Sequence, residues 1–318
     1  MSRPGTVAAI APAKVNLWLE VLGRRDDGYH EVETWMLAVD LCDRIEARRS
    51  DTPGIRLSIR GDERASDLPG GRANLAWRGA EEVISTAGAA GLLDPARAGL
   101  DLVLEKRIPS QAGLGGGSSD AAAAWVATSA ALGLELRPEA GQASLSALGS
   151  DCAFFLQAAG TGSAHCTGRG ERVRPAPAPE RGWSIALATP DLACPTAQVY
   201  AALRRGPRAE GRAPGLPADW SGMAARGVRP FVFNRLEAAA MDAVPRLRAW
   251  RALLDGLGAG LWHLSGSGSS YFALCDERAE AEEALERLRG ACRRAGLTLR
   301  GAWVLRPAGH GAKESEFT

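Results

Sequence analysis

Apolar and polar residues alternate along the first forty-seven positions, a period typical of strands that bury one face. The alternation predicts strands at Val7–Ile10, Val15–Leu22, Glu31–Asp40 and Arg44–Ala47. A further strand is expected at Ile55–Ile59. Polar turn residues rich in Arg, Asp and Gly separate the second of these strands from the third. The chain therefore opens with antiparallel sheet structure.

The pattern then changes to a helical period. Helices are predicted at Asn74–Thr86 and Glu139–Ala147, and an alanine-rich helix from Ser119 to Leu132. The alanine-rich helix follows a predicted strand, Leu100–Lys106, and ends at Gly133, a residue typical of helix ends. Strand, glycine-rich loop and helix thus succeed one another here.

The second half repeats this mixture after a proline-rich segment, 174–179, that favours a connector between domains. Its predicted strands and helices are Trp183–Ala188, Thr196–Leu203, 234–240, 245–257, Gly260–Leu264, Tyr271–Leu274, Arg278–Ala295 and Gly301–Arg306. A polar insertion at 206–217 and a polar tail at 309–318, expected to be mobile, complete the chain. Because strands and helices do not alternate strictly, the pattern predicts an α+β fold with domains at 1–174 and 175–318.

Composition excludes several function classes. The chain has 318 residues, is 46% hydrophobic and 24% charged, and carries a formal net charge of +1. This balance gives no basic field for nucleic acid or a membrane surface, and no apolar stretch is long enough to span a bilayer. The cysteines lack paired spacing, which favours reduced thiols in a cytoplasmic protein and argues against a zinc site. They are Cys42, Cys152, Cys166, Cys194, Cys275 and Cys292.

The clearest candidate chemistry lies between Ile108 and Ala121, where Gly113 to Gly117 holds four glycines in five positions. Glycine lets backbone N–H groups converge, and the start of a helix adds unpaired donors and partial positive charge. Ser118, Ser119 and Asp120 suit the helix cap. The segment therefore predicts an anion cradle, most simply for phosphate.

Two common phosphate motifs do not fit this loop. It lacks the Gly-Lys-Ser/Thr ending of a P-loop. A dinucleotide fold would need an acidic residue after a second strand about 20 residues on, where this chain has helix up to Gly133. A plain glycine linker is the remaining alternative, and the strand and helix on either side disfavour it.

Lysine is rare in this chain, because arginine supplies all but three of its 38 basic residues. Lys14, Lys106 and Lys313 are the exceptions. A general bias against lysine explains the depletion. Against that background the two internal lysines are notable, because a compact ammonium suits phosphoryl transfer.

Five motifs together resemble the GHMP kinase superfamily, and they occur in its order. They are Pro12–Leu17, Asp27–His30, Gly113–Asp120, Gly149–Asp151 and Leu264–Gly268. The resemblance implies a ribosomal-S5-domain-2-like N-terminal domain, a ferredoxin-like C-terminal domain, and the use of ATP and Mg²⁺. It leaves the oligomeric state open.

The resemblance also implies a nucleotide site. The loop would wrap the ATP triphosphate through Pro109, Ser110, Gln111, Ala112, Gly113, Leu114, Gly115, Gly116, Gly117, Ser118 and Ser119. One of the two serines would lie near Mg²⁺. Asn74 resembles a contact on the adenine side, although a helix N-cap explains it equally well. A second Gly/Ser loop, 265–270, is either a phosphate contact or a simple hairpin turn.

Asp151 is the candidate general base. It follows Gly149-Ser150 at what is expected to be a junction from helix to strand, where a carboxylate can project into a cleft. An N-cap is the structural alternative. Lys14 is its candidate partner, since an ammonium beside the carboxylate would keep it ionised. The family usually has Val-Pro after this aspartate, and this chain has Cys152-Ala153.

The remaining motifs imply the acceptor. Asn16 falls on the same strand face as Lys14 and resembles a substrate contact. Tyr29, His30 and Tyr200 resemble a cytidine pocket, with the base between the two tyrosines. This combination resembles the branch that phosphorylates the 2-hydroxyl of 4-diphosphocytidyl-2-C-methyl-D-erythritol in the non-mevalonate isoprenoid pathway. A homoserine or mevalonate type of kinase and an inactive nucleotide-binding regulator are the alternatives.

Overall fold

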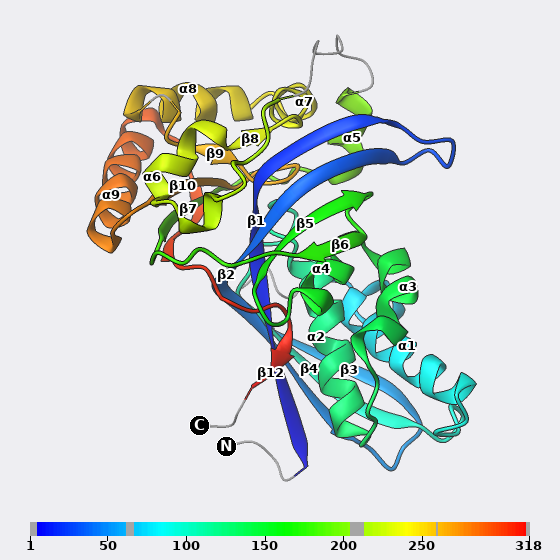
Figure 1. Ribbon diagram of the computed structural model, residues 1–318. Helices are drawn as coiled ribbons and strands as arrows, with labels where there is room; N and C mark the ends of the chain where they lie inside the picture. The colour runs from blue at the N-terminus through cyan, green and yellow to red at the C-terminus, as the bar shows by residue number, and fades with distance from the viewer. Residues whose placement is uncertain (1–4, 62–66, 204–212, 259, 316–318) are drawn as a thin grey trace.

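Two long neighbouring strands dominate the computed structural model, which describes residues 5–61, 67–203, 213–258 and 260–315. They are β1 (Thr6–Arg24) and β2 (His30–Arg49), and they pair antiparallel along nearly their whole length. Each therefore joins two of the predicted strands, with bulges marking where the shorter pieces meet. In Figure 1 both strands run between the two halves of the molecule.

The first sheet is built around this pair, in the order β12-β1-β2-β4-β3. Its other members are β3 (Gly54–Gly61), β4 (Gly99–Lys106), β5 (Ser163–Gly168), β6 (Arg172–Pro175), β8 (Phe233–Asn234) and β12 (Lys313–Glu314). β3 and β4 are parallel and are joined by a crossover helix. β5 and β6 were not among the predicted strands, because each is short and polar on one face.

Four helices cover one face of this sheet (Figure 1). They are α1 (Leu75–Ala89), α2 (Gly116–Ala131), α3 (Pro138–Leu148) and α4 (Cys152–Gln157). Small side chains let α1 and α2 approach closely: a Cβ on Gly79 would meet the carbonyl oxygen of Ala121 at 2.3 Å. The alanine run of α2 is thus buried between neighbouring elements.

The second sheet has the order β11-β7-β10-β9, with every pair antiparallel. Its strands are β7 (Ser184–Pro190), β9 (His263–Leu264), β10 (Tyr271–Cys275) and β11 (Leu299–Leu305). The helices of this half are α5 (Thr196–Leu203), α6 (Ala225–Val228), α7 (Glu237–Ala243), α8 (Leu247–Leu257) and α9 (Arg278–Ala295). Short 3₁₀ turns lie at Gly71–Ala73, Trp220–Gly222 and Arg229–Phe231.

The two sheets pack on each other through alternating residues of their strands. On β7, Ala186 and Ala188 face the cluster that includes α8 and α9, whereas Ile185 and Leu187 face β1 and β2. The two halves therefore share a continuous apolar interface, as the predicted α+β fold requires. The predicted boundary at 174/175 stays a prediction, and β8 and β12 return to the first sheet from beyond it.

Three local expectations were wrong. The glycine-loop helix begins at Gly116 with Gly115 as its N-cap, so Ser118 and Ser119 lie inside its first turn rather than at the cap. A helix, α4, follows Asp151 where a strand was expected. The tail, which was expected to be mobile, pairs with β1 through β12. Just before β12, the N–H groups of Gly311 and Ala312 donate to carbonyl groups of α4 and its end.

Part of the polar insertion, 206–212, and the last three residues of the tail lie outside the described residues. Among the described helices, none combines the length and the apolar character needed to cross a bilayer.

Candidate active site

A cavity of about 420 Å³ opens where the glycine loop, β1, β2 and α5 meet. Every predicted nucleotide residue from Pro109 to Ser118 lines it, together with Asn74. Within the described chain, the N–H groups of Gly113 to Ser118 have no backbone acceptor, as expected for a loop that runs into a helix start. The loop therefore presents a row of free donors to the cavity.

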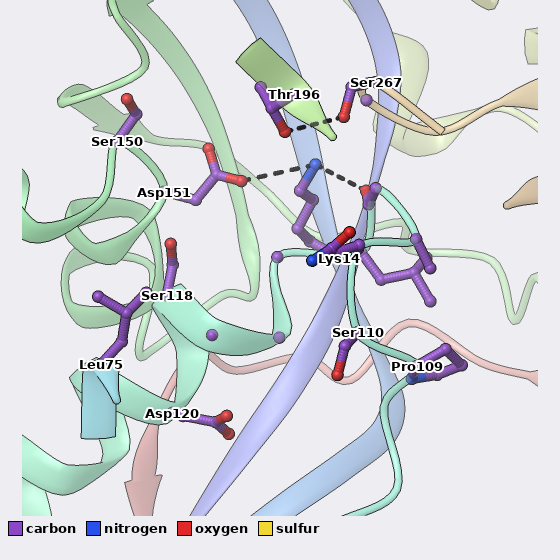
Figure 2. A pocket seen from close by; sticks show the side chains of 18 of the residues that line it. Lys14, Leu75, Pro109, Ser110, Ser118, Asp120, Ser150, Asp151, Thr196 and Ser267 are labelled. Carbon is purple, nitrogen blue, oxygen red and sulfur yellow. Dashed lines mark hydrogen bonds and ion pairs between the residues drawn. The ribbon is translucent and has the colours of Figure 1, made fainter. Parts of the chain in front are cut away.

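Lys14 and Asp151 meet in this cavity, although 137 positions separate them in sequence. The Lys14 Nζ lies 3.6 Å from an Asp151 carboxylate oxygen. Figure 2 shows the two side chains pointing toward one another from β1 and from the start of α4. Asp151 occupies the N-cap position of α4 but makes no side-chain cap bond, so its carboxylate stays available to the cavity.

Two further acceptors fix the ammonium of Lys14. It donates to Asn16 Oδ1 at 2.6 Å and to the carbonyl oxygen of Gly113 at 3.0 Å. Asn16 in turn donates to Thr34 Oγ1 at 2.9 Å. Both Asn16 and Thr34 line the cavity, so the predicted shared strand face is present and Thr34 of β2 extends it.

A buried ion network lies where the glycine loop starts and ends. Lys106 Nζ donates to Asp43 and, at 2.8 Å, to Asp120 on α2. Asp43 also accepts the backbone N–H groups of Arg107 at 2.5 Å and of Ile108 at 2.8 Å. Burial raises the pKa of Asp120 even though Lys106 opposes the shift. The second internal lysine thus ties β2, the end of β4 and α2 together, while Figure 2 places Asp120 apart from Lys14 and Asp151.

Among the remaining nucleotide candidates, some line the cavity and one is buried away from it. Asn74 is the N-cap of α1, accepting from Ala76 N at 2.9 Å, and it also lines the cavity. The N-cap interpretation of Asn74 is therefore confirmed, and the contact on the adenine side stays a prediction. Ser118 lines the cavity, whereas Ser119 is fully buried with no hydrogen-bond partner for its hydroxyl among the described residues.

Of the aromatic candidates, only Tyr200 belongs to the described cavity lining. It lies on α5, and the His30 ring lies 4.9 Å from the Tyr200 ring. Tyr29 is 53% exposed, and the Arg169 guanidinium covers its ring at 4.5 Å. His30, rather than Tyr29, thus stands next to Tyr200, and neither Tyr29 nor His30 belongs to the described cavity lining.

Sequence reasoning assigned no role to several cavity residues, among them Arg169 and Thr196. Arg169 reaches the cavity from the loop after β5. Thr196 Oγ1 and Ser267 Oγ lie 3.0 Å apart on the opposite wall, which Figure 2 shows facing Lys14. The Gly/Ser loop at 265–270 had pointed to Ser267, whereas a lone threonine and a lone arginine gave no pattern to follow.

The arrangement suits transfer of an anionic group to a hydroxyl. Unpaired N–H groups at a helix start neutralise phosphate oxygens. A carboxylate in the cavity can accept a proton from an acceptor hydroxyl placed beside it. Electrostatic positioning of this kind is the main requirement of phosphoryl transfer.

Comparisons with known proteins agree with this geometry. Residues 74–158 match the GHMP kinases N terminal domain, and residues 222–294 match the GHMP kinases C terminal domain. A 4-diphosphocytidyl-2-C-methyl-D-erythritol kinase of Pelotomaculum thermopropionicum is 37% identical over 286 residues, 89% of this chain and 94% of that protein. The Thermus thermophilus protein of the same name is 38% identical over 88% of this chain and 92% of its own. The chain belongs to the 4-diphosphocytidyl-2-C-methyl-D-erythritol kinase family.

Solved structures place this kinase family within a wider fold. A crystal structure titled as 4-(cytidine 5'-diphospho)-2C-methyl-D-erythritol kinase superposes with a TM-score of 0.71 at 36% identity, covering 94% of this chain and 99% of that one. The homoserine kinase of Cytophaga hutchinsonii superposes with a TM-score of 0.69 at 17% identity, over 99% of both chains, and so shares the fold. The prediction of a two-domain GHMP kinase fold is confirmed.

Gly113 offers a test of the loop geometry. It has a φ of +78°, and a Cβ placed there would lie 2.1 Å from the backbone oxygen of Ser265. Gly133 has a similar φ of +69° and open space around it. Gly113→Ala is therefore expected to weaken ATP binding at least tenfold, because the loop must move, whereas Gly133→Ala incurs only the backbone strain of about 1 kcal/mol. Calorimetric titration measures the ATP affinity of both variants, and thermal unfolding measures their stability. Equal ATP affinity in the two variants would contradict the prediction.

Proposed function

We propose that this kinase transfers the γ-phosphoryl group of ATP to the 2-hydroxyl of 4-diphosphocytidyl-2-C-methyl-D-erythritol. The observation that carries the proposal is the ion pair of Lys14 and Asp151, 3.6 Å apart, beside a glycine loop with unpaired N–H groups. Relatives 35–38% identical over most of the chain bear the name of this activity. ADP and the 2-phosphate are the expected products.

Each residue then has a defined part in the reaction. Asp151 accepts the proton of the acceptor hydroxyl as the oxygen forms its bond to the γ-phosphorus. The bond from that phosphorus to the bridging oxygen breaks, and its electron pair leaves on ADP. The Lys14 ammonium, 3.6 Å from Asp151, balances charge on the transferring group. The N–H groups of the glycine loop hold the β- and γ-phosphates.

The residues present also suit Mg²⁺, which usually binds phosphate oxygens, waters and one or two protein oxygens. Ser118 lines the cavity beside the phosphate loop, whereas the buried Ser119 lies outside the described lining. Within the same part of the chain, no cluster of three or more His, Cys, Asp or Glu side chains could enclose a metal by itself. When bound, the ion would neutralise phosphate charge.

Acceptor recognition is proposed at the end of the cavity where Tyr200 lies. Tyr200 and His30 lie ring to ring, and the Tyr29 ring stacks under Arg169. For a cytosine to lie between Tyr29 and Tyr200, Arg169 would have to leave the face of Tyr29. Homoserine and mevalonate have no base to stack on these rings, so this end of the cavity favours the cytidine-bearing acceptor.

A panel of acceptors tests the proposal. The enzyme is incubated with ATP, Mg²⁺ and one of three acceptors: the cytidylyl compound, homoserine or mevalonate. Phosphorus NMR then identifies the phosphorylated product. A new phosphomonoester signal is expected with the cytidylyl compound only. Phosphorylation of homoserine or mevalonate instead would replace the proposed acceptor, and ATP binding with no transfer to any acceptor would favour a regulator.

A further inference from the structure

The carbonyl groups of four consecutive loop residues, Ser110 to Gly113, all accept hydrogen bonds from the C-terminal half of the chain. The donors, in loop order, are Arg300 Nη1 at 3.0 Å, Cys194 N at 3.2 Å, Ser270 N at 3.0 Å and Ser265 Oγ at 3.0 Å. We call these four bonds the carbonyl clasp. They come from three separate segments, so the second domain holds the loop from one side.

We infer that the carbonyl clasp sets the shape of the phosphate loop and that Arg300 is a positioning residue for nucleotide binding. In a planar trans peptide the carbonyl and the following N–H point in opposite directions. Holding the carbonyls of Ser110 to Gly113 against the second domain therefore turns the N–H groups of residues 111–114 away from it. The inference rests on the proposed ATP site.

The loop backbone needs such support. Gln111 has a φ of +53° and is the only residue besides glycine with a positive φ in the described ranges. A side chain in that region costs about 1–2 kcal/mol and persists where neighbouring contacts hold it. The bonds to Ser110 and Gln111 flank this position.

Arg300 is the clasp donor that has a charged side chain, and no sequence motif contains it. It lies on β11, and the pairing of β11 with β7 shifts register between Leu299 and Gly301, directly around Arg300. Bulges of this kind redirect a side chain. Here the redirected guanidinium reaches the loop of the other domain, 190 positions away in sequence.

The clasp also joins the two proposed substrate sites. Cys194 donates to Gln111 only two positions before α5 begins, and α5 carries Tyr200 of the proposed acceptor wall. Arg300 itself is outside the described cavity lining. Because Arg300 acts through the phosphate loop, loss of its side chain is expected to raise the KM for ATP. The KM for the acceptor and kcat should stay nearly unchanged.

Three substitutions test the inference. Arg300→Met keeps the side-chain stem and removes the donor, Arg300→Lys keeps a cationic donor, and Arg289→Met is the control. Arg289 also donates to a backbone carbonyl, that of Ala302 at 3.4 Å, but away from the loop. The dissociation constant for a non-hydrolysable ATP analogue is measured by calorimetry without acceptor, and thermal unfolding is followed in parallel.

Arg300→Met is expected to weaken binding of the analogue roughly tenfold or more, because hydrogen bonds to charged groups are among the stronger ones. Arg300→Lys should restore part of that loss, and Arg289→Met should bind as the wild type does. Wild-type affinity in Arg300→Met, or an equal loss in Arg289→Met, would overturn the inference. Because no acceptor is present, a wrong acceptor assignment leaves this test intact, whereas absence of ATP binding in the wild type would instead refute the proposed ATP site.

Discussion

Asp151→Asn is expected to lower kcat roughly 10²–10⁴-fold while the affinity for ATP stays within a few-fold of the wild type. Asparagine matches aspartate in size but cannot accept the proton of the acceptor hydroxyl. Lys14 keeps its bonds to Asn16 and to Gly113 O, so the local frame remains. Steady-state kinetics and calorimetry with an ATP analogue measure the two quantities separately.

Asp276 provides a matched control for this substitution. Its side chain is 29% exposed against 24% for Asp151, and it pairs with Arg226 at 3.5 Å, close to the 3.6 Å of the Lys14 pair. Asp276→Asn should therefore leave kcat unchanged. If Asp151→Asn also turned over at the wild-type rate, Asp151 would have no part in proton transfer.

The sequence predicted the local pieces of the site because each depends on short-range rules. Gly113 to Gly117 between a strand and an alanine run requires a tight loop and a helix start, whatever the rest of the fold does. Asn16 shares a strand face with Lys14 because side chains alternate along β1. The meeting of Lys14 with Asp151 was implied by the family resemblance, since no local rule links positions so far apart.

The parts that were missed depend on long-range packing. β12 and β5 are short, and pairing with β1 and β2 rather than their own propensity makes them strands. Arg300 looks like one more surface arginine in a chain that has few lysines. Its contact with Ser110 depends on a bulge and on domain packing, neither of which leaves a signal in the sequence.

The aromatic candidates are arranged differently from the pocket that the resemblance implies. His30 lies beside Tyr200, whereas the Tyr29 ring lies against Arg169. The hairpin turn explains this. Asp27 accepts from the N–H of Tyr29 at 3.1 Å, and the Tyr29 ring packs under Arg169 at the surface. The cytosine sandwich stays a prediction.

The buried network around Lys106 leads to the largest expected loss of stability. Lys106 is the only cation that the described structure pairs with Asp43 and Asp120, whose side chains are 0% and 4% exposed. Removing one partner of a buried ion pair leaves uncompensated charge and typically costs about 3–5 kcal/mol. Lys106→Met is thus expected to lower the free energy of unfolding by about that amount, measured by denaturant titration. Lys313→Met, at an exposed position on β12, should change it by less than about 0.5 kcal/mol.

The pH dependence of this loss identifies its cause. Burial raises the pKa of Asp120 above its value in the unfolded chain, so this acid lowers the stability of the fold as the pH rises between those two pKa values. Lys106 opposes that shift in the wild type, and its removal lets the folded-state pKa rise further. The stability gap between Lys106→Met and the wild type should therefore widen as the pH rises above about 8, the raised pKa of Asp120 in the wild type, and stay smaller at lower pH.

A double variant separates charge from packing at the same site. Asp120→Asn in the Lys106→Met background removes the buried titratable carboxyl, while Asp43 still caps the N–H groups of Arg107 and Ile108. It should recover a large part of the lost stability, and the double-mutant cycle gives the coupling energy directly. If the loss of stability in Lys106→Met did not depend on pH, and if the effects of the two substitutions were additive, the loss would come from the missing packing of the lysine stem. Recovery would establish that the ends of the phosphate loop are held by charge pairing.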